Sequence, residues 1–264
     1  MRKVINSLVV EDTGNKKDQS IIFVHGFPFG KWMWDKQVKV LQKKYRCITY
    51  DIRGLGESYV GDGQYTMEAF VYDLFSIIDE LKLVKPVLCG LSMGGYIALR
   101  AVEKDQNKFG GLILCNTKAD ADDDNGKLVR AVNINKINTE GLGKFVDGSV
   151  IFLFAEETPK EKKKLVNEVL ERCKQNNPIG VKGGQIAMIS RTDTNRFLKK
   201  IKIPTLVIAG SFDKLTPPVK MRDMAAKIKN SDFAIVPRAG HLTPVENPGG
   251  FNDLLAGFMK KNFG

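Results

Sequence analysis

Short apolar runs rich in β-branched residues alternate with longer segments of helical periodicity along most of this chain. Such alternation indicates βαβ units and a mainly parallel sheet. Six runs are short, apolar and soon followed by turn or polar residues, which predicts buried strands at Ile21–Val24, Cys47–Tyr50, Val87–Cys89, Leu112–Cys115, Thr205–Ala209 and Phe233–Val236. Two weaker runs predict an antiparallel hairpin at the edge of the sheet, Lys3–Ile5 and Leu8–Glu11.

The segments between these strands place apolar residues at helical spacing. Met67–Leu81 carries such a stripe on one face. Further helices are expected from about Gly94 to Glu103 and from Pro248 to about Lys260. We therefore expect an α/β fold with a mostly parallel eight-stranded sheet and helices on both faces.

The alternation stops between about Lys118 and Arg196, where helical pieces occur without a convincing strand. One helix is expected to start with Thr158 as its N-cap, Pro159 at the first helical position and Glu161 completing a capping box. Because βα alternation resumes afterwards, we interpret residues 119–195, approximately, as a small helical cap inserted into a single domain spanning residues 1–264.

Composition adds limits to this picture. The chain has 43% hydrophobic and 27% charged residues, which favours a packed core, and it has no apolar run long enough to cross a membrane. The net charge is +11, but basic residues are spread along the whole chain without a nucleic-acid-binding motif, so we expect surface charge rather than a nucleic-acid partner. The start of the chain does not resemble a secretory signal, and the cysteines form no C-x-x-C pair, which favours a cytoplasmic protein without disulfides or a zinc site: Cys47, Cys89, Cys115 and Cys173.

The most specific chemical feature is the sequence Gly90-Leu-Ser-Met-Gly94. It lies between a predicted strand and a predicted helix, which is the context of a nucleophile elbow with Ser92 at its apex. Glycines two positions to either side remove side chains that would clash in such a turn. We therefore expect Ser92 to be a catalytic nucleophile.

A serine hydroxyl needs a base, and the chain offers only two histidines, His25 and His241. His241 follows the last predicted strand in a loop that can bring its ring over the carboxyl edge of the sheet, so it is the predicted base. Asp213 follows strand Thr205–Ala209 at the same edge and is the predicted acid. The order serine, acid, histidine along the chain is the one expected when the serine lies on a nucleophile elbow. The remaining acidic candidates include Asp120 and the cluster Asp122–Asp124.

An oxyanion intermediate needs hydrogen-bond donors aimed at it. The amide of Met93, which follows the nucleophile, is one predicted donor, and the amide of Phe27 after the strand ending at His25-Gly26 is the other. Pro28 cannot donate. A purely structural turn at His25–Pro28 remains an alternative.

Four side chains are candidates for substrate binding. Phe29 and Trp34 lie near the predicted oxyanion loop, Leu215 follows Asp213 by two positions, and Phe152 belongs to the apolar cap segment Val150–Phe154. Ordinary core packing is an equally good reading of these apolar residues.

Taken together, these elements resemble the α/β-hydrolase superfamily over essentially the whole chain. The motifs that carry the resemblance are His25-Gly-Phe-Pro28, Asp51-Ile-Arg-Gly-Leu-Gly-Glu-Ser58, the Ser92 elbow, Gly210-Ser-Phe-Asp213 and Ala239-Gly-His241 with Glu246-Asn-Pro248. The resemblance implies that Asp51, Arg53 and Ser58 belong to a structural loop near the elbow. Within the superfamily the chain is similar to small carboxylesterases, 3-oxoadipate enol-lactonase-like lactonases and cofactor-free haloperoxidase-type esterases. The short, lysine-rich cap does not allow any member's specificity to be carried over.

The expected function is hydrolysis of a small carboxylic ester through an acyl-serine intermediate. A lactonase or carbon–carbon bond hydrolase with the same triad is the main alternative, and a small-molecule receptor on this fold is a third. No cofactor and no metal are predicted, and the substrate is expected to be a small ester or lactone. The sequence leaves the oligomeric state open.

Overall fold

A computed structural model describes all 264 residues and contains one eight-stranded sheet with the order β1-β2-β4-β3-β5-β6-β7-β8. Only β1–β2 and β2–β4 pair antiparallel, which confirms the predicted fold class and the edge hairpin. The strands are β1 Arg2–Ile5, β2 Leu8–Thr13, β3 Ser20–Val24, β4 Arg46–Tyr50, β5 Val87–Leu91, β6 Gly111–Cys115, β7 Thr205–Gly210 and β8 Ser231–Val236.

The central strands are short and apolar because both faces of the sheet are covered. Every residue of β3, β4, β5, β6 and β7 is buried, whereas the outer strand β8 is only partly buried. Continuous apolar runs are typical of parallel strands sandwiched between helices. All six predicted strands are present, each extended by one or two residues. Five of them are buried as predicted, but β8 lies at the edge of the sheet and is only partly buried.

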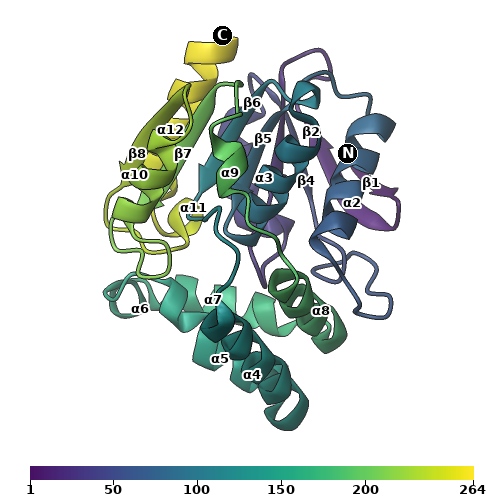
Figure 1. Cartoon of the computed structure of the whole chain (residues 1–264), viewed down its shortest axis with the longest axis vertical. Helices are drawn as coiled ribbons and strands as arrows, with labels where there is room; N and C mark the ends of the chain where they lie inside the picture. The colour runs from purple at the N-terminus through teal and green to yellow at the C-terminus, as the bar shows by residue number, and fades with distance from the viewer.

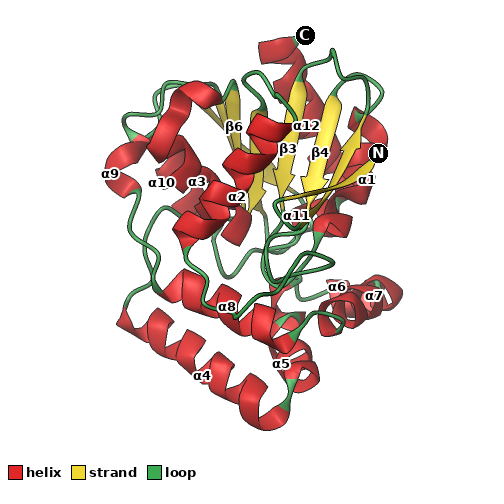
Figure 2. Ribbon diagram, turned by 90° about the vertical axis from the view of Figure 1, so that its right-hand side faces the viewer, coloured by secondary structure: helices red, strands yellow, loops and turns green.

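Helices cover the two faces of the sheet (Figures 1 and 2). One face carries α1 and α12, and the other carries α2, α3 and α10. Thr66 caps α2 by accepting a hydrogen bond from the Ala69 amide, and the apolar stripe of that helix is buried, as its spacing predicts. These helices are α1 Asp35–Leu41, α2 Met67–Glu80, α3 Met93–Asp105, α10 Pro218–Ala226 and α12 Pro248–Phe263.

Between β6 and β7 the chain forms a separate layer of helices at the carboxyl ends of the parallel strands (Figure 2). We call this layer the cap. Its elements are α4 Asp124–Glu140, α5 Leu142–Ser149, η3 Ile151–Leu153, α6 Thr158–Glu161, α7 Lys163–Lys174 and α8 Pro178–Ile189. The remaining short helices are η1 Lys31–Trp34, η2 Gln106–Lys108, α9 Asn195–Leu198 and α11 Thr243–Glu246.

The two stems of the cap are tied to each other where they leave the sheet. The Thr194 amide donates to the Ala119 carbonyl at 2.9 Å. A buried ion pair joins Arg191 of the second stem to Asp122 of the first at 3.1 Å, and Lys118 and Arg130 contact the same carboxylate. Asp122 therefore links the start and the end of the cap.

The predicted capping box at Thr158 is wrong. Thr158 lies inside α6, and its hydroxyl donates to Glu246 Oε2 at 2.6 Å instead of accepting from a helix amide. The Glu161 carboxylate pairs with Arg238 at 3.2 Å. The Glu161 amide, which a capping box would direct to the Thr158 hydroxyl, donates to the Glu157 carbonyl at 2.9 Å. The Thr158 hydroxyl instead makes a charge-assisted hydrogen bond to a buried carboxylate.

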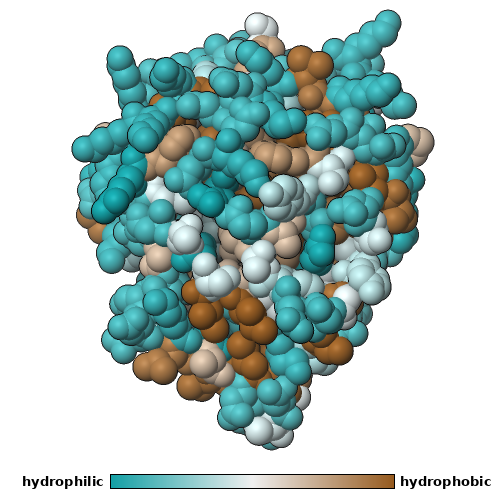
Figure 3. Space-filling model, turned by 45° about the vertical axis from the view of Figure 1, so that its right-hand side comes forward, coloured by the Kyte–Doolittle hydropathy of each residue, from teal (hydrophilic) through white to brown (hydrophobic).

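The surface of the cap is more apolar than the rest of the molecule in the view of Figure 3, where brown side chains gather in the lower half. The exposed apolar residues of the long cap helices are Leu128, Val129 and Val132 of α4, with Ile179 and Ile186 of α8. None of the helices has the combination of length and hydrophobicity that spanning a bilayer requires.

Candidate active site

Ser92 lies at the turn between β5 and α3 with φ +53° and ψ −115°. A positive φ is strained for a residue with a Cβ atom, and the surrounding structure must hold it. The Ser92 amide donates to the Cys115 carbonyl at 3.0 Å, and the Thr117 hydroxyl donates to the Ser92 carbonyl at 2.8 Å. Ser92 is half-buried between the fully buried Leu91 and Met93.

The two glycines of the elbow are required by space. A Cβ atom on Gly94 would overlap the carbonyl oxygen of Val24 at the end of β3, and one on Gly90 would overlap the carbonyl of Gly94. The sequence-based reason for glycine at these positions is therefore present in the structure.

His241 and Asp213 form a buried pair, in which His241 Nδ1 lies 2.9 Å from Asp213 Oδ2. This contact fixes the ring so that Nε2 is left as the free nitrogen. Nε2 is buried and makes no hydrogen bond, so the bond to the Ser92 hydroxyl is not formed in this structure. Such bonds commonly shorten when substrate binds.

Asp213 is held by several donors besides His241. The amides of Leu215 and Thr216 donate to Oδ1 at 2.8 and 2.9 Å, and the Thr216 hydroxyl donates to Oδ2. Burial alone would raise the pKa of Asp213, but the His241 ring and these hydrogen bonds hold it well below its usual value. The carboxylate is thus charged at neutral pH and can stabilise a protonated imidazole.

Asn116 is a site residue that sequence reasoning missed. It follows β6 and is completely buried, and its Nδ2 donates to Asp213 Oδ2 at 2.8 Å and to the Gly240 carbonyl at 3.3 Å. The Thr243 hydroxyl donates to its Oδ1 at 2.7 Å. An asparagine directly after a buried strand at the carboxyl edge was the available signal, but it resembles an ordinary turn residue.

The end of β6 also explains how three distant segments meet. Cys115 and Thr117 bind the backbone of Ser92, and Asn116 between them binds Asp213 and the histidine loop. The structure therefore brings the elbow, the acid and the histidine loop to one edge of the sheet.

The other histidine is occupied elsewhere. His25 Nδ1 lies 2.8 Å from the Gly26 carbonyl, and its Nε2 accepts from the Ile52 amide at 2.9 Å. Burial lowers the pKa of His25, which favours a neutral ring. Both nitrogens serve the backbone, so His25 has none left to activate Ser92.

The other carboxylates named as candidates also have structural partners. Asp122 is paired with Lys118, Arg130 and Arg191, and Asp123 caps α4 through the Gly126 amide at 2.8 Å. Asp120 Oδ1 accepts from Asn195 Nδ2 at 2.7 Å. Asp51, which the resemblance assigns to a structural loop, accepts from the Lys31 amide at 2.7 Å. Of these carboxylates, only Asp213 contacts His241.

The predicted oxyanion donors flank the elbow. Met93 is the first residue of α3, where backbone N–H groups lack a partner within the helix. The loop of Phe27 lies against the elbow, because Val24 pairs with Gly90 and a Cβ on Gly26 would meet the Leu91 carbonyl at 3.3 Å. The Phe27 ring packs on Phe145 of the cap with a centroid separation of 6.4 Å.

The proposed substrate-binding side chains are placed differently from one another. Trp34 is fully buried between Phe23 and Phe251, and Phe29 is buried as well, so both are part of the hydrophobic core. Phe152 is 76% exposed, because the turn η3 directs it outward, and Leu215 is 59% exposed. None of the four candidates lines the cavity described next, and their role in substrate binding stays a prediction.

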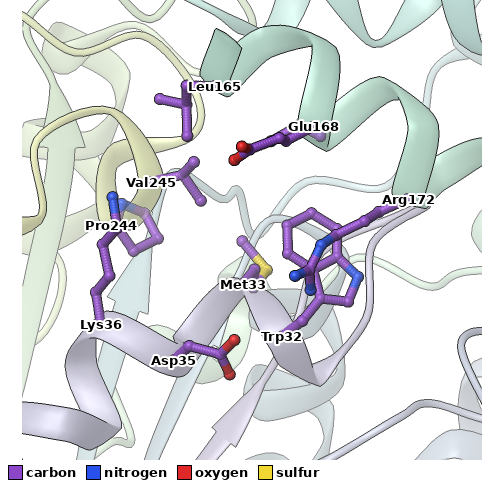
Figure 4. Close-up of a pocket in the computed structure, with 10 residues that line it drawn as sticks. Trp32, Met33, Asp35, Lys36, Leu165, Glu168, Arg172, Pro244 and Val245 are labelled. Atoms are coloured by element: carbon purple, nitrogen blue, oxygen red, sulfur yellow. The ribbon is translucent and has the colours of Figure 1, made fainter.

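A cavity of about 130 Å³ lies between α7 and the segments η1, α1 and α11 (Figure 4). Trp32 and Met33, the neighbours of Trp34, contribute to its wall, and Val245 faces them from the histidine side. The Arg172 guanidinium lies 5.0 Å from the centre of the Trp32 ring. Two of the apolar residues that follow the predicted oxyanion loop, Trp32 and Met33, therefore line this cavity.

An eight-stranded α/β sheet with a strained serine elbow and a buried Asp–His pair at its carboxyl edge defines the class of α/β hydrolases. The model of the alpha/beta hydrolase fold family matches residues 19–248. The chain belongs to this family of hydrolases.

Among its relatives is 3-oxoadipate enol-lactonase 1 of Acinetobacter baylyi, 28% identical over 96% of this chain and 93% of the relative. A thermophilic esterase from Thermogutta terrifontis, solved with malate bound, is similar with a TM-score of 0.94 and 33% identity, covering 100% of this chain and 99% of that one. The enol-lactonase from Burkholderia xenovorans LB400 is similar with a TM-score of 0.90 and 25% identity, covering 98% and 100%.

Proposed function

We propose that the protein is a serine hydrolase that cleaves a small carboxylic ester through an acyl-serine intermediate. The single observation that carries this proposal is the buried Asp213–His241 pair. It leaves His241 Nε2 without a hydrogen bond, at the same edge of the sheet as Ser92 on its strained elbow. The similarity to an esterase and to enol-lactonases supports the same chemistry.

The mechanism has two halves. Ser92 Oγ attacks the ester carbonyl while His241 Nε2 takes the hydroxyl proton, and the amides of Phe27 and Met93 stabilise the oxyanion. The tetrahedral intermediate expels the alcohol, which receives the proton from His241. Water then attacks the acyl-serine with His241 as base again, and the acid is released as Ser92 regains its proton.

The charge of Asp213 stabilises the imidazolium in both halves. Its contact to Nδ1 also fixes the tautomer that leaves Nε2 free for the proton of Ser92.

The proposal is tested by the turnover of p-nitrophenyl acetate. Ser92→Ala should lower kcat/KM by at least about a thousandfold, because the nucleophile is lost. Ser76→Ala is a matched control, since the Ser76 hydroxyl binds only the Tyr72 carbonyl within α2. Equal rates for Ser92→Ala and the wild type would contradict the proposal.

Lactone hydrolysis by the same triad is a second candidate, favoured by the enol-lactonases among the relatives. A panel of short-chain esters and of five- and six-membered lactones separates the two functions. A kcat/KM at least about tenfold higher for a lactone than for every ester would replace the ester by the lactone as the substrate class.

A further inference from the structure

Glu246 is a fully buried carboxylate that the mechanism does not use. It ends the short helix α11, is 1% exposed, and forms no ion pair. Its two oxygens accept four hydrogen bonds instead: Oε1 from the amides of Gly240 and Leu242, and Oε2 from the Ala155 amide and the Thr158 hydroxyl. A buried charge is tolerable only when its acceptor capacity is satisfied in this way.

The two oxygens serve two different parts of the protein. Gly240 and Leu242 are the residues on either side of His241, and their amides lie 2.9 and 3.2 Å from Oε1. Ala155 and Thr158 belong to the cap, and they lie 2.9 and 2.6 Å from Oε2. One carboxylate thus joins the backbone on both sides of the candidate base to the cap.

Other contacts reinforce the same junction. The His241 amide donates to the Leu153 carbonyl of the cap at 2.8 Å, and Lys162 Nζ of the cap donates to the Glu246 carbonyl at 2.7 Å. A Cβ atom on Gly240 would overlap the Ala155 amide, so the cap backbone lies directly against the histidine loop. The histidine loop is therefore restrained by the cap segment Leu153–Lys162, and a shift of one should displace the other.

We infer that Glu246 is a positioning residue that makes the orientation of His241 depend on the seating of the cap. This inference rests on the proposed function, in which His241 is the base. When the cap segment Ala155–Thr158 is seated, Glu246 holds the amides of Gly240 and Leu242, and the ring stays on Asp213. When that segment shifts, Oε2 loses its donors, the carboxylate can rotate or hydrate, and the histidine loop loosens.

The cap-side residue Thr158 gives the cleanest test, because it makes no hydrogen bond to His241 or to the amides that flank it. Thr158→Val removes the hydroxyl donor to Glu246 and keeps the shape of the side chain, whereas Thr158→Ser keeps the hydroxyl. We expect Thr158→Val to lower kcat for p-nitrophenyl acetate by about tenfold with little change in KM, the loss associated with one charge-assisted hydrogen bond. Thr158→Ser should restore most of that loss.

A matched control separates positioning from general weakening of the cap. Ile137→Ala truncates a buried side chain of α4 that has no part in the Glu246 junction. We expect it to reduce thermal stability while kcat for the same small ester stays within about twofold of the wild type. Glu246→Gln, which leaves one acceptor oxygen for four donors, should reproduce the effect of Thr158→Val.

Proton NMR supplies a readout that does not depend on turnover. The chain has only two histidines, so the Nδ1 proton of His241 in its hydrogen bond to Asp213 can be assigned by comparison with His241→Gln. Faster exchange of this proton with water in Thr158→Val than in Thr158→Ser supports the inference. Unchanged exchange and unchanged kcat in Thr158→Val and Glu246→Gln would overturn it. The proposed function fails separately, if Ser92→Ala retains turnover.

Discussion

Asp213 shows how the site concentrates polar groups around a single carboxylate. It accepts from His241, Asn116 and three donors of its own loop, so the charge is fixed in position before any substrate arrives. Such preorganised groups stabilise a developing positive charge on the imidazole without further rearrangement. The residues that orient Asp213 should then affect the rate although they never touch the substrate.

Asn116 provides the test at this scale. Asn116→Ala removes one donor from Asp213 and leaves the Thr243 hydroxyl without its acceptor, in a completely buried location. We expect kcat for a small ester to fall by about tenfold and the free energy of unfolding to fall by about 1–3 kcal/mol. Steady-state kinetics and urea unfolding measure both effects.

Thr243→Val is the matched variant, because it removes the donor to Asn116 but leaves the bond to Asp213. It should lower stability and leave kcat within about threefold of the wild type. An equal loss of kcat in both variants would contradict a specific role of the Asn116–Asp213 bond.

The sequence predicted the three triad residues of this site but not the residues that orient them. Ser92, His241 and Asp213 were identified by position and by the fold resemblance, and the structure brings Asp213 and His241 into contact. The roles of Asn116 and Glu246 could not be predicted, because they depend on contacts between distant segments. Asn116 binds Gly240, 124 residues away, and Glu246 binds Thr158, 88 residues away. The role of Trp34 stays a prediction, because the short helix η1 turns Trp34 into the core and Trp32 and Met33 toward a cavity.

At the scale of elements, strands were easier to predict than the cap. A buried parallel strand needs apolar residues on both faces, and that requirement is visible locally in runs such as Val87–Leu91. The cap helices bury only parts of their surfaces, and α4 exposes several apolar residues. The spacing of apolar residues therefore predicts the ends of these helices less well than those of the strands. The helix predicted at Thr158 is present, but its capping box is absent because the Thr158 hydroxyl binds Glu246, eighty-eight residues away.

The cap stems offer a prediction about elements. Asp122→Asn leaves Arg191 and Arg130 with a neutral partner in a mostly buried location. We expect the free energy of unfolding to fall by about 3 kcal/mol, as for a broken buried ion pair. Urea unfolding at neutral pH measures the loss.

Asp124→Asn is the control for that measurement. The Asp124 side chain is 98% exposed and lies 3.5 Å from Lys127, so its replacement should change stability by less than about 0.5 kcal/mol. A similar loss in both variants would show that the Asp122 cluster contributes no more than a surface pair.

At the scale of the whole molecule, the long-range pairing of the sheet brings the functional segments together. The order β3-β5-β6-β7 puts the carboxyl ends of four neighbouring parallel strands beneath the cap. The predicted oxyanion loop, the elbow, Asn116 and Asp213 follow those ends in turn. This arrangement is typical of ligand sites in α/β sheets. The placement of Ser92 and Asp213 at this edge could be predicted from the sequence because each comes soon after an apolar strand, whereas the strand order and the role of Asn116 could not.

Acid should destabilise the molecule through its buried carboxylates. Burial would raise the pKa of Asp122, but Arg130 and Lys118 hold it well below its usual value, and the pKa of Asp213 is lowered too. The pKa of an unfolded aspartate is about 3.9, so as the pH falls toward that value the unfolded state binds more protons than the folded state. The stabilisation is therefore complete above about pH 5 and is lost as the pH falls further.

Urea unfolding of the wild type and Asp122→Asn at pH 7, 5 and 3 tests this linkage. We expect the wild type to be more stable at pH 7 and 5, and the difference to narrow at pH 3 because only the wild type loses the Asp122 contribution. A difference that is the same at all three values would contradict the lowered pKa of Asp122.

Covalent labelling by a fluorophosphonate, followed by peptide mapping, tests the central claim most directly. The reagent reacts with a serine only when a base activates it, so the label should be found on Ser92 and should form at least about a hundredfold more slowly in His241→Gln. A label on another residue, or an equal labelling rate without His241, would contradict the account.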